Sequence, residues 1–277
     1  MTGGHTREFS MSESDFKIIS ELAYKYTGIV LGPHKMDMVY GRLARRLRAL
    51  NLTSVSDYIV LIEKEHQEEI SQFINAITTN LTSFFREKHH FDFLSKSILP
   101  DLLKTNDSSR KIRAWSAGCS TGEEPYSISI TLRDCYNLKN WDCKILATDL
   151  DSQVLQKAQS GIYEVDRIES LSKDLKSKWF MRDVNHPDIV KVKPSLQELI
   201  SFKRLNLLED WPMKGTFDFI FCRNVLIYFN TETQNLLFEK YAKALKQGGY
   251  LIIGHSESIS LDCSFFKPIG QTVYQKI

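Results

Sequence analysis

The pattern of apolar and polar positions divides the chain into an all-helical first part and a mixed second part. Before residue 80, apolar residues recur at the spacing of amphipathic helices, and no segment shows a convincing strand pattern. The helical segments are 15–27, 33–51, 55–64 and 68–79. The pattern therefore predicts an all-helical amino-terminal domain at 1–80.

After residue 110, short apolar runs alternate with helical patterns. The predicted strands are 112–117, 143–148, 217–222 and 249–254, and the predicted helices are 124–137, 152–160 and 231–246. Such alternation is typical of an α/β domain, in which helices cover both faces of a parallel sheet. We expect this domain at 111–277, and we interpret 81–110 as a linker and pocket lip.

The alternation breaks down between 161 and 205. Two short runs there, 189–193 and 199–203, have the spacing of a small β hairpin. We therefore expect a small antiparallel β subdomain inserted into the α/β domain at about 161–205.

The stretch 113–126 predicts a buried strand, a glycine turn and a helix that starts near Glu124. Gly118 and Gly122 allow a tight turn, and the helix start offers unpaired N–H groups. The glycine spacing fits neither G-x-G-x-x-G nor G-x-x-x-x-G-K-[ST], so the turn does not predict phosphate binding. Asp149 ends the second strand and can bind both hydroxyls of a ribose. A nucleoside without phosphates fits best, and an ordinary packing turn is the alternative.

Arg223, Asn224 and Tyr228 lie at or beyond the end of the third strand. Because the carboxyl ends of strands in an open α/β sheet form the ligand crevice, Arg223 and Asn224 should face the same cleft as Gly118 and Asp149. Tyr228 lies just beyond, and we expect it near a reacting centre.

A further polar group precedes the sheet. Asn80, Thr82 and Arg86 surround Phe84 and Phe85, and this pattern favours a pocket lip. The alternative places the two phenylalanines in the core and Arg86 in solvent. The histidines, including His89 and His90, have no convergent acids at metal-ligand spacing, so we predict no metal site.

Charge and cysteine content limit the class of protein. A net charge of +2 over 277 residues gives no overall attraction to nucleic acid or membrane, so a charged partner must meet a local patch. Five cysteines without a C-x-x-C pair argue against a disulfide framework and against a zinc site. The chain shows neither a leader pattern nor an apolar run of bilayer length, and we expect a cytoplasmic monomer without membrane insertion.

The second predicted helix carries a local basic patch. Apolar residues occupy one arc of this helix, and the opposite arc carries Arg42, Arg45, Arg46 and Arg48. A cationic stripe predicts docking to an acidic surface, and a solvated face with intramolecular salt bridges is the alternative. Nucleic acid is a weaker candidate because exposed aromatic residues do not interrupt the stripe.

Together these motifs closely resemble the CheR family of chemotaxis receptor methyltransferases, over nearly the whole chain. The matching segments are 42–48, 79–86, 115–127, 148–149, 205–207, 221–229 and 254–257. The resemblance implies a Rossmann-like, doubly wound, S-adenosylmethionine-dependent methyltransferase that makes glutamate γ-methyl esters on chemoreceptors and releases S-adenosylhomocysteine.

The resemblance also implies roles for individual residues. The residues that it assigns to the cofactor pocket are Asn80, Thr82, Arg86, Glu124, Asp149, Asn206, Leu207, Arg223 and Asn224. We add Gly118 to this pocket because it lies in the glycine turn. Arg86 and Tyr228 would lie closest to the transferred methyl group, and the arginine face would contact acidic receptor helices. The β subdomain would dock a receptor's carboxyl-terminal peptide, although members with this tether tend to carry a glycine that 182–189 lacks.

The implied chemistry requires positioning more than base catalysis. A glutamate carboxylate, with a pKa of about 4.3, is already ionised at neutral pH.

The motifs also argue against two other enzyme classes. A nicotinamide dehydrogenase would need a G-x-G-x-x-G turn, which this chain lacks. A nucleic-acid amino-methyltransferase would carry an Asn or Asp followed by Pro-Pro-aromatic, where this chain has Arg223-Asn-Val. A noncatalytic signalling adaptor that binds S-adenosylmethionine remains the alternative.

Overall fold

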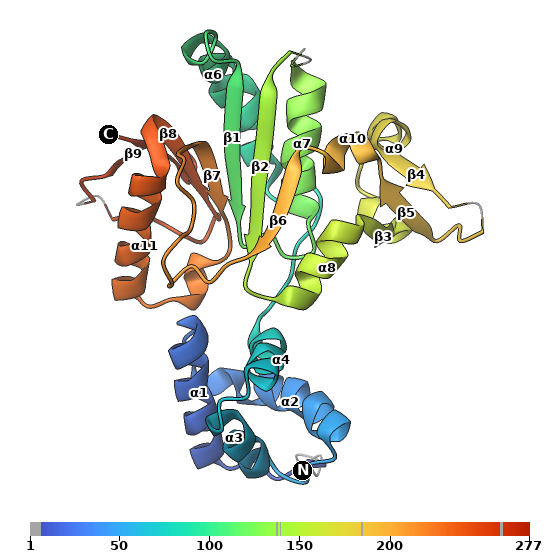
Figure 1. The fold of residues 1–277 in the computed structure, drawn as a ribbon, viewed down its shortest axis with the longest axis vertical. Helices are drawn as coiled ribbons and strands as arrows, with labels where there is room; N and C mark the ends of the chain where they lie inside the picture. Colours follow the sequence, from blue (N-terminus) through green and yellow to red (C-terminus); the bar gives the residue numbers. More distant parts are fainter. Residues whose placement is uncertain (1–6, 137, 139, 184, 261–262) are drawn as a thin grey trace, which may run out of the picture. The chain divides into compact units, whose positions relative to one another are not determined.

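The computed structural model describes residues 7–136, 138, 140–183, 185–260 and 263–277. The first six residues of the predicted helical domain and the predicted helix end at Asn137 therefore lie outside the described residues. The chain forms two compact units (Figure 1). The first contains the residues up to Thr79 with Tyr228–Asn230, and the second contains Asn80–Ile227 with Thr231–Ile277.

The described part of the first unit is helical, as predicted. Its elements are α1 (Glu13–Thr27), the 3₁₀ turn η1 (Pro33–Lys35), α2 (Met36–Leu50), α3 (Val55–Glu63) and α4 (Gln67–Ile77). Ser12 and Asp15 form a capping box that starts α1, and Gly28 ends it in the left-handed conformation with φ 70°. Ile19, Leu43 and Phe73 are fully buried and belong to the core of this unit.

A sheet of seven described strands, in the order β6-β2-β1-β7-β8-β10-β9, forms the centre of the second unit. The strands are β1 (Lys111–Ala117), β2 (Asp142–Asp149), β6 (Ile200–Arg204), β7 (Phe217–Cys222), β8 (Leu245–Ile253), β9 (Phe266–Gly270) and β10 (Val273–Lys276). The first five of these pair in parallel, which confirms the four predicted strands, whereas β9 and β10 add an unpredicted antiparallel edge.

Helices cover both faces of this sheet, as predicted. On one face, α7 (Glu123–Cys135) and the helical segment 88–105 pack on β1, β2, β7 and β8. On the other face, Trp115 of β1 packs against Tyr241 of α11 (Thr231–Ala244). Helix α8 (Ser152–Ser160) follows β2, and η4 (Leu226–Tyr228) follows β7.

The segment 81–110 is more than a linker and pocket lip. It contains α5 (Lys88–Phe93), a π-helical turn η2 (Leu94–Ile98) and α6 (Leu99–Thr105). Phe91, Leu94 and Leu99 from these helices are buried in the core beneath the sheet. None of the described helices combines the length and the apolar character that a membrane span requires.

The predicted insertion is an antiparallel sheet, but its predicted pairing is wrong. The sheet has the order β3-β5-β4, with β3 (Ile162–Glu164), β4 (Phe180–Arg182) and β5 (Ile189–Val192). The run 199–203 does not pair with β5; it forms β6, which joins the main sheet parallel to β2. The reason is burial, because Ile200 and Phe202 pack on the cluster of Cys119, Ala147 and Leu155.

The remaining elements surround this small sheet. They are η3 (Val165–Ile168), α9 (Lys173–Trp179) and α10 (Pro194–Gln197). Phe84 packs edge-on against Tyr163 of β3 and Phe180 of β4. The insertion therefore shares an aromatic core with the segment that contains Asn80, Thr82 and Arg86.

Candidate functional site

The glycine turn connects β1 to α7 beside the carboxyl end of β2. The amides of Gly118 and the next residue donate to the carbonyl of Thr148 at 2.8 and 2.9 Å. Gly118 has φ 87° and Gly122 has φ 99°, a region that favours glycine. A Cβ at Gly118 would lie 2.4 Å from Val225, and one at Gly122 would lie 2.9 Å from Ala158. Backbone conformation and internal packing thus both require these glycines.

Asp149 fixes the other side of this turn. Its Oδ2 accepts from the Ser120 amide at 2.8 Å, and its Oδ1 accepts from the Asp151 amide at 2.9 Å. Burial raises the pKa of Asp149 to about 6, although these hydrogen bonds oppose the shift. Asn80 donates to the Asp151 carboxylate at 2.8 Å, and its carbonyl accepts from the Ser120 hydroxyl. The structure therefore brings Asn80 and Asp149 together through their shared partners Ser120 and Asp151.

The first turn of α7 is acidic and buried. Glu124 accepts from the Ser116 hydroxyl at 2.7 Å and pairs with Arg223 at 3.2 Å, and Glu123 pairs with Arg167. Burial raises the pKa of Glu124, because a carboxylate loses hydration there. The start of α7 therefore presents carboxyl groups, which accept hydrogen bonds and suit a ligand with hydroxyl groups.

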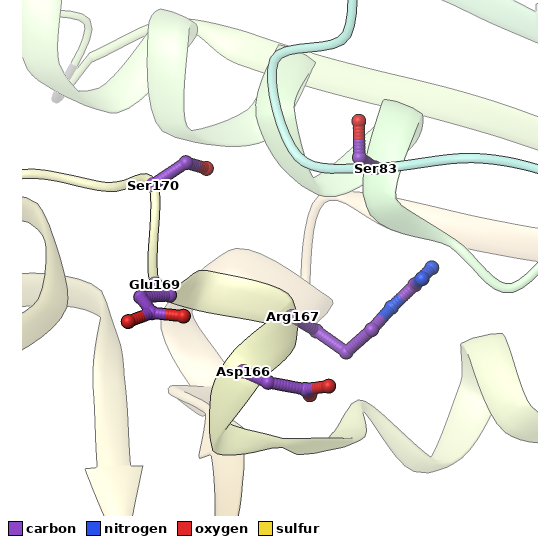
Figure 2. A pocket seen from close by; sticks show the side chains of 5 residues that line it. All are labelled: Ser83, Asp166, Arg167, Glu169 and Ser170. Carbon is purple, nitrogen blue, oxygen red and sulfur yellow. The ribbon is translucent and has the colours of Figure 1, made fainter.

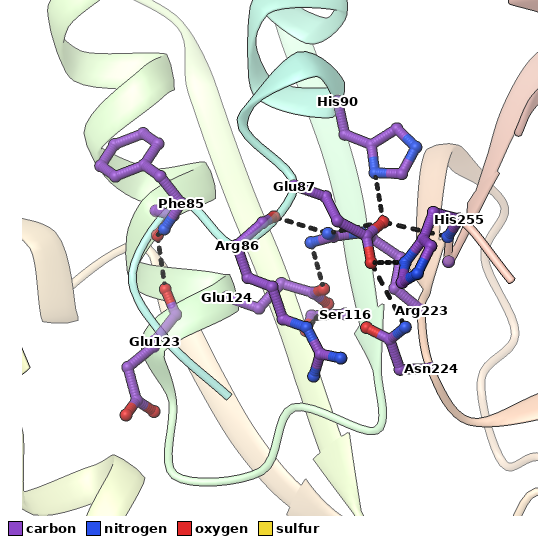
Figure 3. Close-up of polar contacts among 12 residues, drawn as sticks. Phe85, Arg86, Glu87, His90, Ser116, Glu123, Glu124, Arg223, Asn224 and His255 are labelled. Atoms are coloured by element: carbon purple, nitrogen blue, oxygen red, sulfur yellow. Dashed lines mark hydrogen bonds and ion pairs between the residues drawn. The ribbon is translucent and has the colours of Figure 1, made fainter. Parts of the chain in front are cut away.

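Arg223 and Asn224 follow β7 and enter one polar network (Figure 3). The buried Arg223 donates from Nη2 to the Arg86 carbonyl at 2.5 Å, and the same nitrogen lies 3.1 Å from the Glu87 carboxylate. Asn224 has φ 58°, and its amide donates to Glu257 at 3.0 Å. Arg223 and Asn224 thus lie with Arg86. Two acids complete the network: Glu257, from the segment 254–257 that carries part of the resemblance, and Glu87, which had no predicted role.

Glu87 also converges with two histidines, which corrects the expectation that no acid does so. Ligand atoms of Glu87, His89 and His90 lie within 4.8 Å of one another. Burial, Arg223 and His89 lower the pKa of His90 to about 3, so its ring is neutral. The permanent charge of Arg223 opposes a second cation at this position. The prediction that the protein has no metal site stays a prediction.

Arg86 lies in a constrained part of the chain. Its Nη1 donates to the Leu81 carbonyl at 2.6 Å, and its side chain is half-buried. The residues on either side, Phe85 and Glu87, have left-handed backbones with φ 52° and 55°. Phe84 is in the core, as the alternative reading expected, whereas Arg86 is not free in solvent.

Thr82 contributes a backbone contact to Arg167, which lines a hollow of about 500 Å³. The Thr82 carbonyl accepts from Arg167 at 2.9 Å. Figure 2 shows the side chains that line this hollow. The hollow is lined by Ser83, Asp166, Arg167, Glu169 and Ser170. No residue predicted for the cofactor pocket lines this hollow.

Asn206 and Leu207 follow β6, which pairs with β2. The amide of Leu205 donates to the Asp149 carbonyl at 3.0 Å, so the segment starts beside that acid. The Asn206 side chain accepts from the Leu208 amide at 3.1 Å, and the buried Leu207 presents its carbonyl to Trp211 at 3.1 Å.

Two arginines of the predicted docking face are engaged within the first unit. Arg42 donates to the carbonyls of Ile77 and Thr78 at 2.9 and 2.8 Å, where α4 ends. Arg46 forms an ion pair with the buried Glu69, and its Nε donates at 2.8 Å. These two guanidiniums stabilise the helical unit from within.

The other two arginines of the predicted docking face are more accessible. Arg48 is exposed and pairs with Glu8 at 2.6 Å. Arg45 is also exposed, and no hydrogen bond or ion pair joins its side chain to another described residue. Tyr228 was predicted within the domain at 111–277, but it belongs to the first unit, where its carbonyl accepts from the Val30 amide at 2.9 Å and Lys35 lies 5.3 Å from its ring centre.

Comparison with known proteins gives concordant matches over both units. Residues 14–78 match the family model "CheR methyltransferase, all-alpha domain", and residues 80–275 match "CheR methyltransferase, SAM binding domain". Proteins named chemotaxis protein methyltransferase are similar throughout. The one from Klebsiella aerogenes is 43% identical over 95% of this chain and 90% of its own length. For those of Salmonella typhimurium and Escherichia coli the identity is also 43%, over 97% of this chain and 92% and 93% of theirs.

Proposed function

The chain belongs to the CheR methyltransferase family, and on that premise we propose that it methylates glutamate side chains of bacterial chemoreceptors, forming γ-glutamyl methyl esters. It is an S-adenosylmethionine-dependent methyltransferase of chemotaxis. Beyond this activity, we propose that the acceptor is a glutamate carboxylate and that the substrate is the cytoplasmic helical region of the receptor. We also propose that the protein is a cytoplasmic monomer.

The edge formed by the ends of β1, β2 and β7 fits the donor chemically. Glu124, Asp149 and Asp151 outnumber Arg223 there, which suits a cationic ligand that lacks phosphates. We propose that Asp149 holds the ribose hydroxyls and that Glu124 and Asn80 hold other polar groups of the donor. When bound, S-adenosylmethionine supplies a methyl group that its positively charged sulfur has already activated.

The fixed guanidinium of Arg86 is the observation that supports a carboxylate as the acceptor. Its guanidinium is held by the Leu81 carbonyl at 2.6 Å, and its own carbonyl is held by Arg223. A fixed guanidinium recognises a carboxylate well, because its N–H groups match carboxylate geometry. We therefore assign to Arg86 the orientation of the incoming glutamate.

A carboxylate acceptor also suits the protonation states of nearby groups. The buried His90 is neutral with a pKa of about 3, and the carboxyl groups of Glu87 and Asp149 already accept protein hydrogen bonds. These groups position the site instead of removing a proton, and an ionised glutamate needs no deprotonation. Correct alignment is then the main contribution of the enzyme.

Residues of the first unit complete the proposal. Tyr228 is assigned a place near the methyl group by family resemblance. Arg45 is the best candidate on α2 for an acidic receptor helix, because it is exposed and, unlike Arg48, forms no ion pair with a described residue. We propose that the unit docks the receptor helices and that the sheet β3-β5-β4 receives a receptor's carboxyl-terminal peptide where one exists.

The test combines labelled donor with receptor-containing membranes. We expect the full chain to transfer labelled methyl groups to the receptor as base-labile esters, which base releases as methanol. A receptor whose modified glutamates are changed to alanine should lose the label, and Tyr228→Phe should lower kcat with donor affinity retained. If the label on the receptor were stable in base, the product would not be a methyl ester. If no label were incorporated although the chain binds the donor, the noncatalytic alternative would be supported.

A further inference from the structure

Glu87 joins three segments of the second unit that are far apart in the sequence. Its Oε1 accepts from the His255 ring at 2.7 Å and from the Asn224 side chain at 3.3 Å. Its Oε2 accepts from the His255 amide at 3.1 Å and faces Arg223 at the same distance. One carboxylate at the start of α5 therefore fixes the residues that follow β7 and β8 (Figure 3).

The backbone around Glu87 depends on these contacts. Phe85, Glu87 and Asn224 are non-glycine residues in the left-handed region, with φ 52°, 55° and 58°. Such residues persist only where their surroundings hold them. The Phe85 amide is held by Ser127 at 2.9 Å, and the Glu87 carboxylate holds Asn224. Arg86 lies between two of these residues, so its place depends on the same contacts.

Arg223 transmits the position of Glu87 to the proposed cofactor residues. Its side chain is 2% exposed and lies between two carboxylates, Glu87 at 3.1 Å and Glu124 at 3.2 Å. It also donates to the Arg86 carbonyl at 2.5 Å. A buried guanidinium that loses one of its two carboxylates shifts toward the other, since an unpaired buried charge is unfavourable.

We propose that Glu87 is a positioning residue for S-adenosylmethionine, because it holds Arg223 where the Arg86 backbone and the Glu124 carboxylate keep the arrangement that the donor requires. The inference rests on the proposed assignment of Arg86, Glu124 and Arg223 to the cofactor pocket. Glu87 acts through these residues, whereas the receptor helices dock on the first unit in the proposed function, so loss of Glu87 changes donor affinity more than receptor affinity.

The charge of Glu87 is part of this role. Burial would raise its pKa, but the His255 hydrogen bond and the Arg223 charge outweigh burial and lower the pKa to about 2. The group is therefore ionised at neutral pH. Glutamine keeps the size and shape of the side chain while it removes the negative charge, which makes Glu87→Gln the informative substitution.

The test measures binding of S-adenosylhomocysteine to the full chain by calorimetry, without receptor. For Glu87→Gln we expect affinity to fall about tenfold or more, because Arg223 loses a buried partner. The matched control is Lys88→Gln, which removes an exposed i,i+4 ion pair with Asp92 next to Glu87 and should leave affinity unchanged. In steady-state assays, KM for the donor should rise and KM for the receptor should not.

Glu87→Asp separates positioning from a general loss of structure. Aspartate keeps the charge on a shorter stem, so its donor affinity should lie between the wild-type and Glu87→Gln values, with normal circular dichroism. A Glu87→Gln variant with wild-type donor affinity overturns the inference. An equal loss of receptor affinity, or a Glu87→Asp variant that does not fold, overturns it as well, because Glu87 would then act on stability. Since the calorimetric binding assay contains no receptor, failure of ester formation would contradict the proposed function alone.

Discussion

At the residue scale, Asp149 makes the proposed donor site sensitive to pH. Burial raises its pKa to about 6, and an ionised carboxylate accepts hydrogen bonds more strongly than a protonated one. We predict that affinity for S-adenosylhomocysteine decreases as the pH falls through about 6, where Asp149 gains its proton. Calorimetric titrations on both sides of that pH measure the effect.

The control for this prediction is Asp149→Asn. This variant should bind weakly at every pH, without the decline that protonation of Asp149 causes. An unchanged pH dependence in Asp149→Asn would assign the effect to Glu124, whose pKa burial also raises.

The sequence predicts which acids lie at the ends of strands, but it does not predict which distant segments come into contact. Asp149 could be predicted because it ends an apolar run, and strand ends in an α/β sheet share one edge. Glu87 could not, because its partners Asn224 and His255 come from remote positions and meet it only in the folded chain. Its place directly after Arg86 was the available local signal.

At the element scale, the turn between β1 and α7 should tolerate no side chain at Gly118. Gly118→Ala places a Cβ at φ 87° and 2.4 Å from Val225. We predict a loss of about 2–4 kcal/mol in the free energy of unfolding, from left-handed strain and overpacking. Val225→Ala in the same chain should recover part of this loss, and denaturant unfolding measures both variants.

Gly41 provides a contrasting glycine. It lies within α2, and apart from its chain neighbours and the nearby backbone of that helix, a Cβ there meets no described atom within 4 Å. Gly41→Ala should therefore raise the free energy of unfolding by about 0.5–1 kcal/mol, because alanine loses less backbone freedom on folding. A similar loss in both alanine variants would show that Gly118 has no special steric requirement.

The arginines of α2 should separate into structural and accessible ones. Arg46→Ala leaves the buried Glu69 without its cation, and we predict a loss of about 1–3 kcal/mol in unfolding free energy. Arg45→Ala should change stability by less than about 0.5 kcal/mol and should reduce receptor methylation. Equal stability of both variants in denaturant unfolding would contradict the structural role of Arg46.

Strands with a clear run of apolar residues were predicted correctly. The pairing of a strand was predicted wrongly where tertiary packing determines it. Strands β1 and β7 are short apolar runs buried in the main sheet. The run at β6 carries the same kind of signal as β5, yet contact with β2 and the cluster around Cys119 places it in the main sheet. Only tertiary burial decides whether β6 pairs with β5 or with β2. The alternation of apolar and polar residues cannot show this, so it predicted the wrong hairpin.

At the scale of the whole molecule, charge is nearly balanced. The chain has 36 Lys and Arg residues against 34 Asp and Glu residues, so long-range attraction to an acidic receptor must come from an accessible local group. Several cations of α2 are neutralised within their own unit, as Arg46 and Arg48 are by Glu69 and Glu8. The exposed Arg45 is therefore expected to carry much of the electrostatic attraction.

We predict that salt weakens receptor methylation more than donor binding. Exposed charges are screened beyond about 8 Å at physiological ionic strength, whereas the buried pair of Arg223 and Glu124 is screened much less. Raising the salt concentration should lower kcat/KM for the receptor and leave the affinity for S-adenosylhomocysteine nearly constant. Arg45→Ala should flatten the salt dependence of kcat/KM, and Lys88→Gln should not. If Arg45→Ala kept the wild-type dependence, the attraction to the receptor would have to arise from another surface.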